Sequence, residues 1–166
     1  MTLDEGKAKF IQAWGTFGSK WGINRTMAQV HALLLIAPNS LSADEIMDAL
    51  DISRGNANMN LRALIDWALV MKEFKPGDRK EYFYAEKDIW KVGTQIVAQR
   101  KKRELEPIRE ILSSLDNIEG DSEEVEVFRK TVHEITEISA ATDRILEKIT
   151  KSDRNWILST FIKMLS

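Results

Sequence analysis

The sequence contains no cysteine among its 166 residues. That absence excludes a disulfide framework, a thiol nucleophile and a thiolate metal site. Histidine is almost as scarce: the chain has only His31 and His133, far apart in the sequence and each within an apolar-leaning segment. His133 with Glu134 or Glu137 could supply metal ligands, but nothing else in the sequence supports that reading. We therefore expect no metal site and a satisfied core position for His31.

Long apolar runs and signal-peptide features are also missing. The longest apolar run is Ala32 to Ala37, far shorter than a membrane span, and the first five residues lack the cationic and apolar regions of a signal peptide. No glycine-rich phosphate loop follows a predicted strand, because Gly15, Gly18 and Gly22 fall inside a helical pattern. The expectation is a cytoplasmic protein with no membrane partner, no cofactor and no enzymatic activity.

What the chain does contain is a globular composition, with 43% hydrophobic and 30% charged residues. This excludes an intrinsically disordered protein, and the length suits one domain with an appended element. The most informative sequence motifs lie in residues 41–84.

The chain from Ser42 onward has the pattern of a short helix, a tight turn at 51–52 and a longer helix. Ser42 with Glu45 forms a capping box at the start of the first helix, and Ser53 caps the second. The 3.6-residue period puts one apolar face on the second helix, made by Ala57, Leu61, Leu64 and Ile65. The opposite face is polar and free to contact something else, which is typical of a helix-turn-helix.

A β-hairpin is predicted next, from runs at 69–75 and 80–85. Pro76 and Gly77 between them fit a type II turn, in which glycine takes the position with positive φ. Residues 51–80 hold six cations against four anions, so this segment carries +2 while the whole chain carries −2. A local basic surface on an acidic chain suits a nucleic-acid backbone.

These motifs carry a family resemblance. The sequences SRGN at 53–56, NMNLR at 58–62, WALV at 67–70 and KPGDRK at 75–80 resemble the GbsR-like branch of the MarR-type winged-helix transcriptional regulators. The resemblance continues through DIW at 88–90 and RKKRE at 100–104, and is loose in the last third of the chain. Ala68 departs from the pattern, since the family usually has glycine after the tryptophan.

The resemblance and the residue chemistry together predict a DNA interface. Asparagine can pair with adenine, arginine with guanine, and a methionine can pack on the methyl group of thymine. Three asparagines in one helix, at 56, 58 and 60, argue for a role besides stability because asparagine is a poor helix former. The predicted DNA-binding residues are Ser42, Ser53, Arg54, Gly55, Asn56, Asn58, Met59, Arg62, Lys75, Arg79 and Lys80.

Two helices are expected before this unit, at 4–21 and from a cap at Asn24 to before Pro38. The glycines at 15, 18 and 22 line one side of the first helix, which is either simply buried or in close contact with another helix, across a dimer interface for example. Arg25 lies in a first turn, where a cation opposes the helix dipole, so it needs a carboxylate or phosphate partner.

Long helices are expected after the wing, from 88 to about 115 with a kink at Pro107, from Ser122 onward, and from Asp153. The basic run 100–103 is either a solvated helix face or a phosphate patch. The second of these helices has an apolar seam, formed by Val125, Phe128, Val132, Ile135, Ile138, Thr142, Ile145 and Ile149. Such a seam packs either on the chain's own long helix or on a second copy.

We therefore predict a mainly α fold: a winged helix-turn-helix with a small β-hairpin wing, plus long C-terminal helices for dimerisation. Residues 1–87 form the DNA-binding domain, whose helix 4–21 is shared with the dimer interface, and residues 88–166 form the helical dimerisation region. The expected function is a sequence-specific transcriptional regulator, a dimeric repressor on a palindromic operator. The alternative is a winged helix that contacts only other proteins.

A small-molecule effector is a further expectation, because some GbsR-like proteins respond to choline-type osmolytes. Trp14, Trp21, Trp67 and Trp90 are the candidate cage for a quaternary ammonium, although tryptophans at helical spacing are more often core residues.

Overall fold

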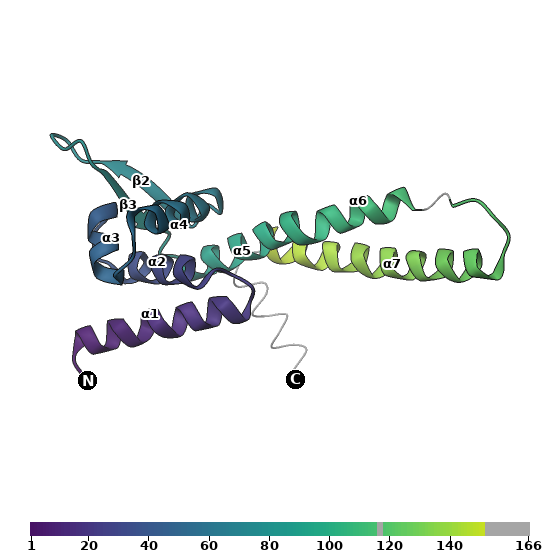
Figure 1. The fold of residues 1–166 in the computed structure, drawn as a ribbon, viewed down its shortest axis with the longest axis horizontal. Coiled ribbons are helices and arrows are strands. Elements are labelled where there is room, and N and C mark those ends of the chain that lie inside the picture. Colours follow the sequence, from purple (N-terminus) through teal and green to yellow (C-terminus); the bar gives the residue numbers. More distant parts are fainter. Residues whose placement is uncertain (116–117, 152–166) are drawn as a thin grey trace. The chain divides into compact units, whose positions relative to one another are not determined.

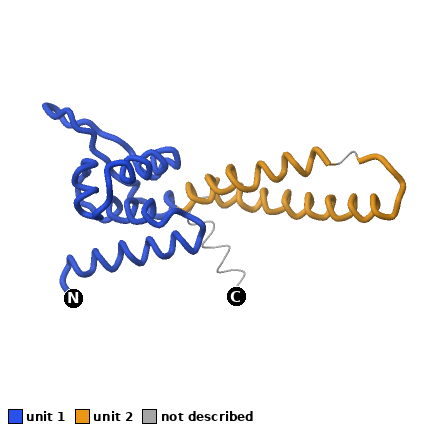
Figure 2. Tube along the Cα trace, in the orientation of Figure 1, with its two compact units in different colours: residues 1–92 blue, residues 93–166 orange. Residues whose placement is uncertain are grey.

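The protein is described from a computed structural model, which covers residues 1–115 and 118–151. The chain divides into two compact units, Met1–Val92 and Gly93–Ser166 (Figure 2). Figure 1 shows the elements of each unit in order along the chain. The fold is mainly α with one small antiparallel sheet, which confirms the predicted fold class. Within the described ranges, no helix is both long enough and apolar enough to cross a membrane.

Two helices open the first unit, as predicted. α1 (Leu3–Lys20) begins with a capping box between Thr2 and Glu5. α2 (Arg25–Ile36) is capped by Asn24, whose side-chain oxygen accepts from the amide of Met27 at 3.1 Å. A side chain from outside the helix caps the C-terminus of α2. The Lys87 ammonium donates hydrogen bonds to the carbonyls of residues 34, 35 and 37 at 2.7–2.9 Å. Burial of this ammonium lowers the pKa of Lys87.

The glycines of α1 explain how closely it lies on α2. A Cβ built on Gly18 would stand 2.6 Å from the Ala28 Cβ, and one on Gly15 would stand 2.7 Å from the Gln29 Cγ. The close helix–helix contact suggested by the glycine spacing is therefore made within the chain, against α2. Gly22 does not join it: this residue has a φ of +76°, and no atom lies within 4 Å of the position that a Cβ would take there.

The helix-turn-helix follows, with the predicted caps confirmed. β1 (Leu41–Ser42) leads into α3 (Ala43–Leu50), and Ser42 and Glu45 form the capping box. Asp51 ends α3 in the left-handed region, with φ of 51°. Ser53 then caps α4 (Arg54–Asp66) by accepting from the amide of Asn56 at 3.3 Å.

The wing is formed by β2 (Val70–Phe74) and β3 (Glu81–Ala85), paired antiparallel with Lys72 opposite Phe83. β1 adds a third strand that the sequence did not predict, giving the order β1-β3-β2. Gly77 has a φ of 82°, as the type II turn requires. Ala68 is also left-handed, with φ of 55°, which costs an alanine about 1–2 kcal/mol relative to glycine.

The core of the first unit lies where α2, α3, α4 and the sheet meet. Its most completely buried side chains are Val30, Leu34, Ile46, Leu61, Leu64, Val70 and Val92. Leu61 and Leu64 come from the predicted apolar face of α4, so this face fixes which side of α4 is left exposed.

The second unit is a helical hairpin. α5 (Ile89–Arg100) crosses the boundary between the two units and continues into a π-helical turn, η1 (Lys101–Leu105), which precedes α6 (Glu106–Ser114). The predicted irregularity at Pro107 thus takes the form of a wide turn just before it, with proline in the first turn of α6. α7 (Glu123–Lys151) returns alongside η1 and α6 (Figure 1).

Ion pairs occupy much of the basic run 100–103. Arg100 pairs with Glu104 at 3.1 Å, and Lys101 pairs with Asp143 of α7 at 3.0 Å. Asp143 also forms an ion pair with Arg109 at 2.8 Å. The ammonium of Lys101 is the main cause of the lowered pKa of Asp143. Arg100 is thus paired along its own helical stretch and Lys101 is paired across the hairpin, which favours the helix-face reading of this run over a phosphate patch.

The prediction that the apolar residues of α7 form one continuous packing surface is wrong for the chain by itself. Some of these side chains are buried in the hairpin and others are exposed. Val132 is buried against the rest of the hairpin, together with Ser139, a residue the apolar pattern did not select. Phe128, Ile135, Ile138 and Ile145 of the predicted seam remain exposed, Ile138 to 68%. The last predicted helix, from Asp153, lies outside the described residues.

Candidate nucleic-acid interface

α4 presents a polar outer face opposite the one that packs in the core. Asn58, Met59 and Arg62 are exposed on it, Met59 to 59%, while Ala57, Leu61 and Leu64 are buried on the other side. The 3.6-residue period produces this division directly. An amide, a thioether and a guanidinium therefore stand together on one surface, where each can contact a base edge.

The N-terminus of α4 is open to an approaching backbone. Arg54 and Gly55 are exposed there, and no atom lies within 4 Å of the position a Gly55 Cβ would take. Amides of a first helical turn, together with the helix dipole, favour a phosphate at this end. Ser53 is the N-cap of α4 and so stabilises this first turn.

The asparagines of α4 do not form one set. Asn60 is 2% exposed, and its side-chain amide donates to the backbone oxygen of Asn56 at 2.9 Å and to the Asn56 Oδ1 at 2.6 Å. Asn60 is thus a buried structural residue, which corrects the argument that the three asparagines together indicate a role besides stability. Asn56 is half-buried and shares its oxygens with Asn60, so Asn58 is the asparagine best exposed for reading a base.

Ser42 is also removed from the proposed interface by its position. It is 4% exposed, and its hydroxyl and amide are both engaged with Glu45 in the capping box. These backbone and side-chain bonds from Ser42 are the main reason why the pKa of Glu45 is lowered, with the charges of Lys75 and Lys80 contributing. Ser42 therefore builds the helix-turn-helix and does not face outward.

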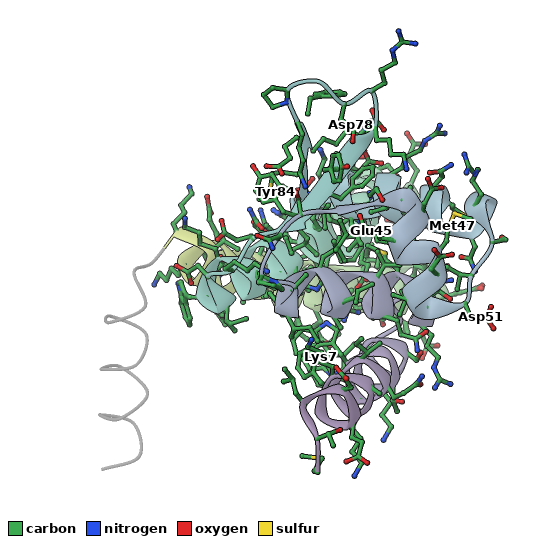
Figure 3. All side chains as sticks on the ribbon, turned by 90° about the vertical axis from the view of Figure 1, so that its left-hand side faces the viewer. Lys7, Glu45, Met47, Asp51, Asp78 and Tyr84 are labelled. Carbon is green, nitrogen blue, oxygen red and sulfur yellow. The ribbon has the colours of Figure 1, made fainter. Side chains whose placement is uncertain are left out.

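The cations of the wing lie on a turn that side-chain hydrogen bonds hold in place. Asp78 accepts from the Tyr82 hydroxyl at 2.7 Å and from the Lys80 amide at 3.0 Å. The Tyr82 bond is the main cause of a lowered pKa for Asp78 and a raised one for Tyr82. Lys75 lies over the Tyr82 ring, 3.7 Å from its centroid. Asp78 marks the outer end of the hairpin in Figure 3, where Arg79 is also exposed.

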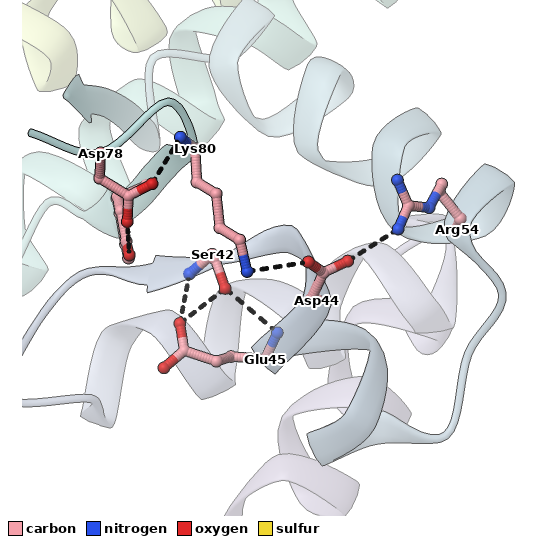
Figure 4. Close-up of polar contacts among 7 residues, drawn as sticks. Ser42, Asp44, Glu45, Arg54, Asp78 and Lys80 are labelled. Carbon is pink, nitrogen blue, oxygen red and sulfur yellow. Dashed lines mark hydrogen bonds and ion pairs between the residues drawn. The ribbon is translucent and has the colours of Figure 1, made fainter. Parts of the chain in front are cut away.

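One carboxylate joins the two cationic elements. Asp44, in the first turn of α3, pairs with Arg54 of α4 at 2.9 Å and with the Lys80 ammonium of the wing at 3.4 Å (Figure 4). Sequence reasoning missed Asp44, because an acid in a first turn is explained by the helix dipole alone. It missed Tyr82 as well, although its spacing of four from Asp78 across a tight turn was a usable signal.

The tryptophans proposed as an effector cage come from three elements. Trp14 and Trp21 belong to the aromatic stripe of α1, where each packs on Phe17, and Trp14 also contacts His31. Trp67 is the C-cap of α4, and Trp90 lies in the first turn of α5. A cleft of about 550 Å³ at the base of the wing is lined by the loop 37–40, both wing strands and Lys87, but by none of these tryptophans. The cage stays a prediction.

Two other candidates have structural explanations. Arg25 donates to the Gln12 side-chain oxygen at 2.9 Å, so the partner it needs is an amide of α1. His31 is buried beside Trp14, and burial, with a smaller effect of the Lys87 charge, lowers its pKa to about 4. Residues 1–115 and 118–151 contain no group of three or more side chains suited to a metal ion.

Comparison with known proteins bears on this site. Residues 21–81, which include α2, the helix-turn-helix and most of the wing, match the MarR family. Over 86 residues the chain is 28% identical to the HTH-type transcriptional repressor GbsR of Bacillus subtilis (strain 168). That alignment covers 52% of this chain and 47% of the relative, so the chain spans about half the length of the curated protein it matches.

A solved structure extends the comparison to the fold of most of the chain. The crystal structure of a transcriptional regulator aligns with a TM-score of 0.67 and 18% identity. The alignment covers 87% of this chain and 95% of that one. The resemblance inferred from the sequence motifs is confirmed.

Proposed function

We propose that this chain, whose residues 21–81 carry the MarR-family sequence, is a DNA-binding transcriptional regulator without enzymatic activity. The observation that carries the proposal is the exposed face of α4 beside a cationic wing, both built on the same buried core. Repression is the mode we favour, since the curated relative is named as a repressor.

In the proposed complex, α4 enters the major groove. Asn58 and Arg62 read base edges, and Met59 packs on a thymine methyl group. Gly55 lets a phosphate approach the first turn of α4. Lys75, Arg79 and Lys80 contact phosphates or a minor groove through the wing, so they add affinity for every sequence and little discrimination.

The competing function is a winged helix that contacts only proteins. It would require an apolar outer face on α4 and an uncharged wing tip, whereas Asn58, Arg62 and Arg79 are exposed there. Fluorescence anisotropy with a labelled duplex, repeated over a range of salt concentrations, separates the two functions. A DNA-binding regulator loses affinity steeply as salt rises, with a slope near −0.9 per phosphate contact. Absence of binding at low salt would refute the proposal.

We further propose that the regulator is a homodimer, with residues 1–87 as the DNA-binding domain and residues 88–166 as the dimerisation region. One recognition helix reads too few base pairs to select a genomic site, and two-fold symmetry solves this with half-sites about 34–36 Å apart. Two exposed apolar surfaces support the proposal. One is the outer stripe of α7, namely Phe128, Ile135, Ile138 and Ile145; the other is Phe17 and Trp21 at the end of α1.

Sedimentation velocity tests the dimer. The wild-type chain is expected to sediment as a dimer at micromolar concentration, and the double variant Ile135→Ser/Ile138→Ser as a weaker dimer or a monomer. Lys130→Ser is the matched control, because it changes another exposed side chain of α7 to the same residue. A monomeric wild-type chain would refute the dimer while leaving DNA binding open.

A further inference from the structure

Asp44 links the two elements that the proposed function brings to DNA. One of its carboxylate oxygens pairs with the guanidinium of Arg54 at 2.9 Å, and the other pairs with the Lys80 ammonium at 3.4 Å (Figure 4). Arg54 is the first residue of the recognition helix, and Lys80 directly precedes the returning wing strand β3. All three side chains are exposed to solvent along part of their length.

We propose that Asp44 is an internal competitor of DNA phosphate, which holds Arg54 and Lys80 in the free protein and sets how tightly the protein binds any duplex. This inference rests on the proposed DNA-binding function. A carboxylate and a phosphate are both anions with oxygen acceptors that suit the same cations. The carboxylate therefore occupies, between the helix and the wing, a place that a backbone phosphate would otherwise take.

The exchange is feasible because the pairs are exposed. Exposed ion pairs contribute little to stability because water and salt screen them, so a phosphate can replace the carboxylate at small cost. While the pairs persist, however, the single negative charge of Asp44 offsets one of the two positive charges that Arg54 and Lys80 would bring to DNA. Fewer counterions are then released from DNA on binding, and affinity falls for all sequences alike.

The neighbouring carboxylates cannot take over this role. Glu45 is engaged by the amide and hydroxyl of Ser42 at 2.7 Å each. Asp78 is engaged by the Tyr82 hydroxyl and the Lys80 amide. Asp44 is the carboxylate of this group whose described contacts are with the two cations.

The test measures binding of the full chain to a labelled duplex of mixed sequence, about three helical turns long, at several salt concentrations. Asp44→Asn, which removes the charge and keeps the shape, is expected to bind about two- to tenfold more tightly at low salt. Its salt dependence should be steeper than that of the wild type by about one phosphate contact. Asp44→Glu should retain wild-type behaviour, because it keeps a carboxylate.

Asp48→Asn is the matched control, since Asp48 is an exposed carboxylate one turn later on α3. Its effect on affinity should be clearly smaller than that of Asp44→Asn. Equal effects of the two variants would overturn the proposal, because only the net charge would then matter. Unchanged or weaker binding by Asp44→Asn, with an unchanged salt slope and an unaltered melting temperature, would overturn it too. Failure of the wild type to bind DNA would instead refute the proposed function.

Discussion

Gly18 of α1 lies so close to Ala28 of α2 that a Cβ on Gly18 would stand 2.6 Å from the Ala28 Cβ. Neither partner in this contact is the flexible end of a long side chain. The two helices can therefore keep their spacing only while position 18 has no side chain.

Gly18→Ala should for this reason destabilise the protein. Alanine gains about 1 kcal/mol of helix propensity, but relieving the clash costs about 1–3 kcal/mol, so we expect a net loss of up to about 2 kcal/mol. Urea unfolding measures it. Gly6→Ala is the control in the same helix, where a Cβ would meet its nearest neighbour at 4.0 Å. A Gly18→Ala protein as stable as Gly6→Ala would show that α1 does not pack on α2 this closely.

A second prediction concerns the buried imidazole of His31. Its pKa of about 4 in the folded state lies below the value of about 6.5 for an exposed histidine. The folded protein therefore disfavours the charged form. The contribution of neutral His31 to the free energy of unfolding is fully present above pH 6.5. It is lost progressively as the pH falls towards 4, by about 3 kcal/mol in total.

Unfolding measured against pH checks this. His31→Gln, which cannot titrate, should lose less stability than the wild type between pH 6.5 and 4. His133→Gln, which removes the exposed histidine of α7, is the matched control for loss of a histidine. Parallel curves for wild type and His31→Gln over this interval would mean that His31 is not buried in the neutral form.

A third prediction concerns base reading by α4. Arg62→Ala should cost about 1–3 kcal/mol on a preferred sequence and relax the preference at one base pair, because an arginine can pair with guanine through two bonds. Asn58→Ala should do the same at another base pair. Competition binding with single-base variants of the preferred duplex measures both effects. Arg144→Ala removes an exposed cation of α7 and should leave selectivity unchanged. If both α4 variants keep wild-type selectivity, a different face of the protein meets DNA.

A fourth prediction separates the wing from the recognition helix. Arg79→Ala should weaken binding to all sequences about equally and flatten the salt dependence by about one contact. Lys72→Ala is the matched control, because Lys72 is a wing cation already paired with Glu81 across the sheet at 2.9 Å. An unchanged salt slope for Arg79→Ala would remove the wing tip from the interface.

Features set by neighbouring residues could be read from the sequence. The caps at Asn24, Ser42 and Ser53 depend on bonds that span three residues, and all three form as predicted. The turn at Gly77 likewise follows from a local pattern. These short-range signals are sufficient to place the helix-turn-helix and the wing, and with them most of the candidate interface.

Features set by the tertiary structure could not be read in this way. The helical period places Asn60 beside Ala57 and Leu64 on the buried face, but only the folded chain shows that its amide bonds to Asn56. The apolar positions of α7 share one spacing, yet the hairpin buries Val132 and leaves Ile138 exposed. Asp44 is separated by ten residues from Arg54 and by more from Lys80, and only the folded chain brings the three together.

The measurement that tests the central claim most directly is selection of bound duplexes from a randomised library by the full chain, followed by sequencing. A dimeric regulator that reads DNA through α4 should enrich an inverted repeat with half-sites centred about 10–10.5 base pairs apart, and Arg62→Ala should lose one conserved base pair in each half. Recovery of a library with no enriched sequence, under conditions where the wild-type chain binds DNA, would contradict sequence-specific recognition.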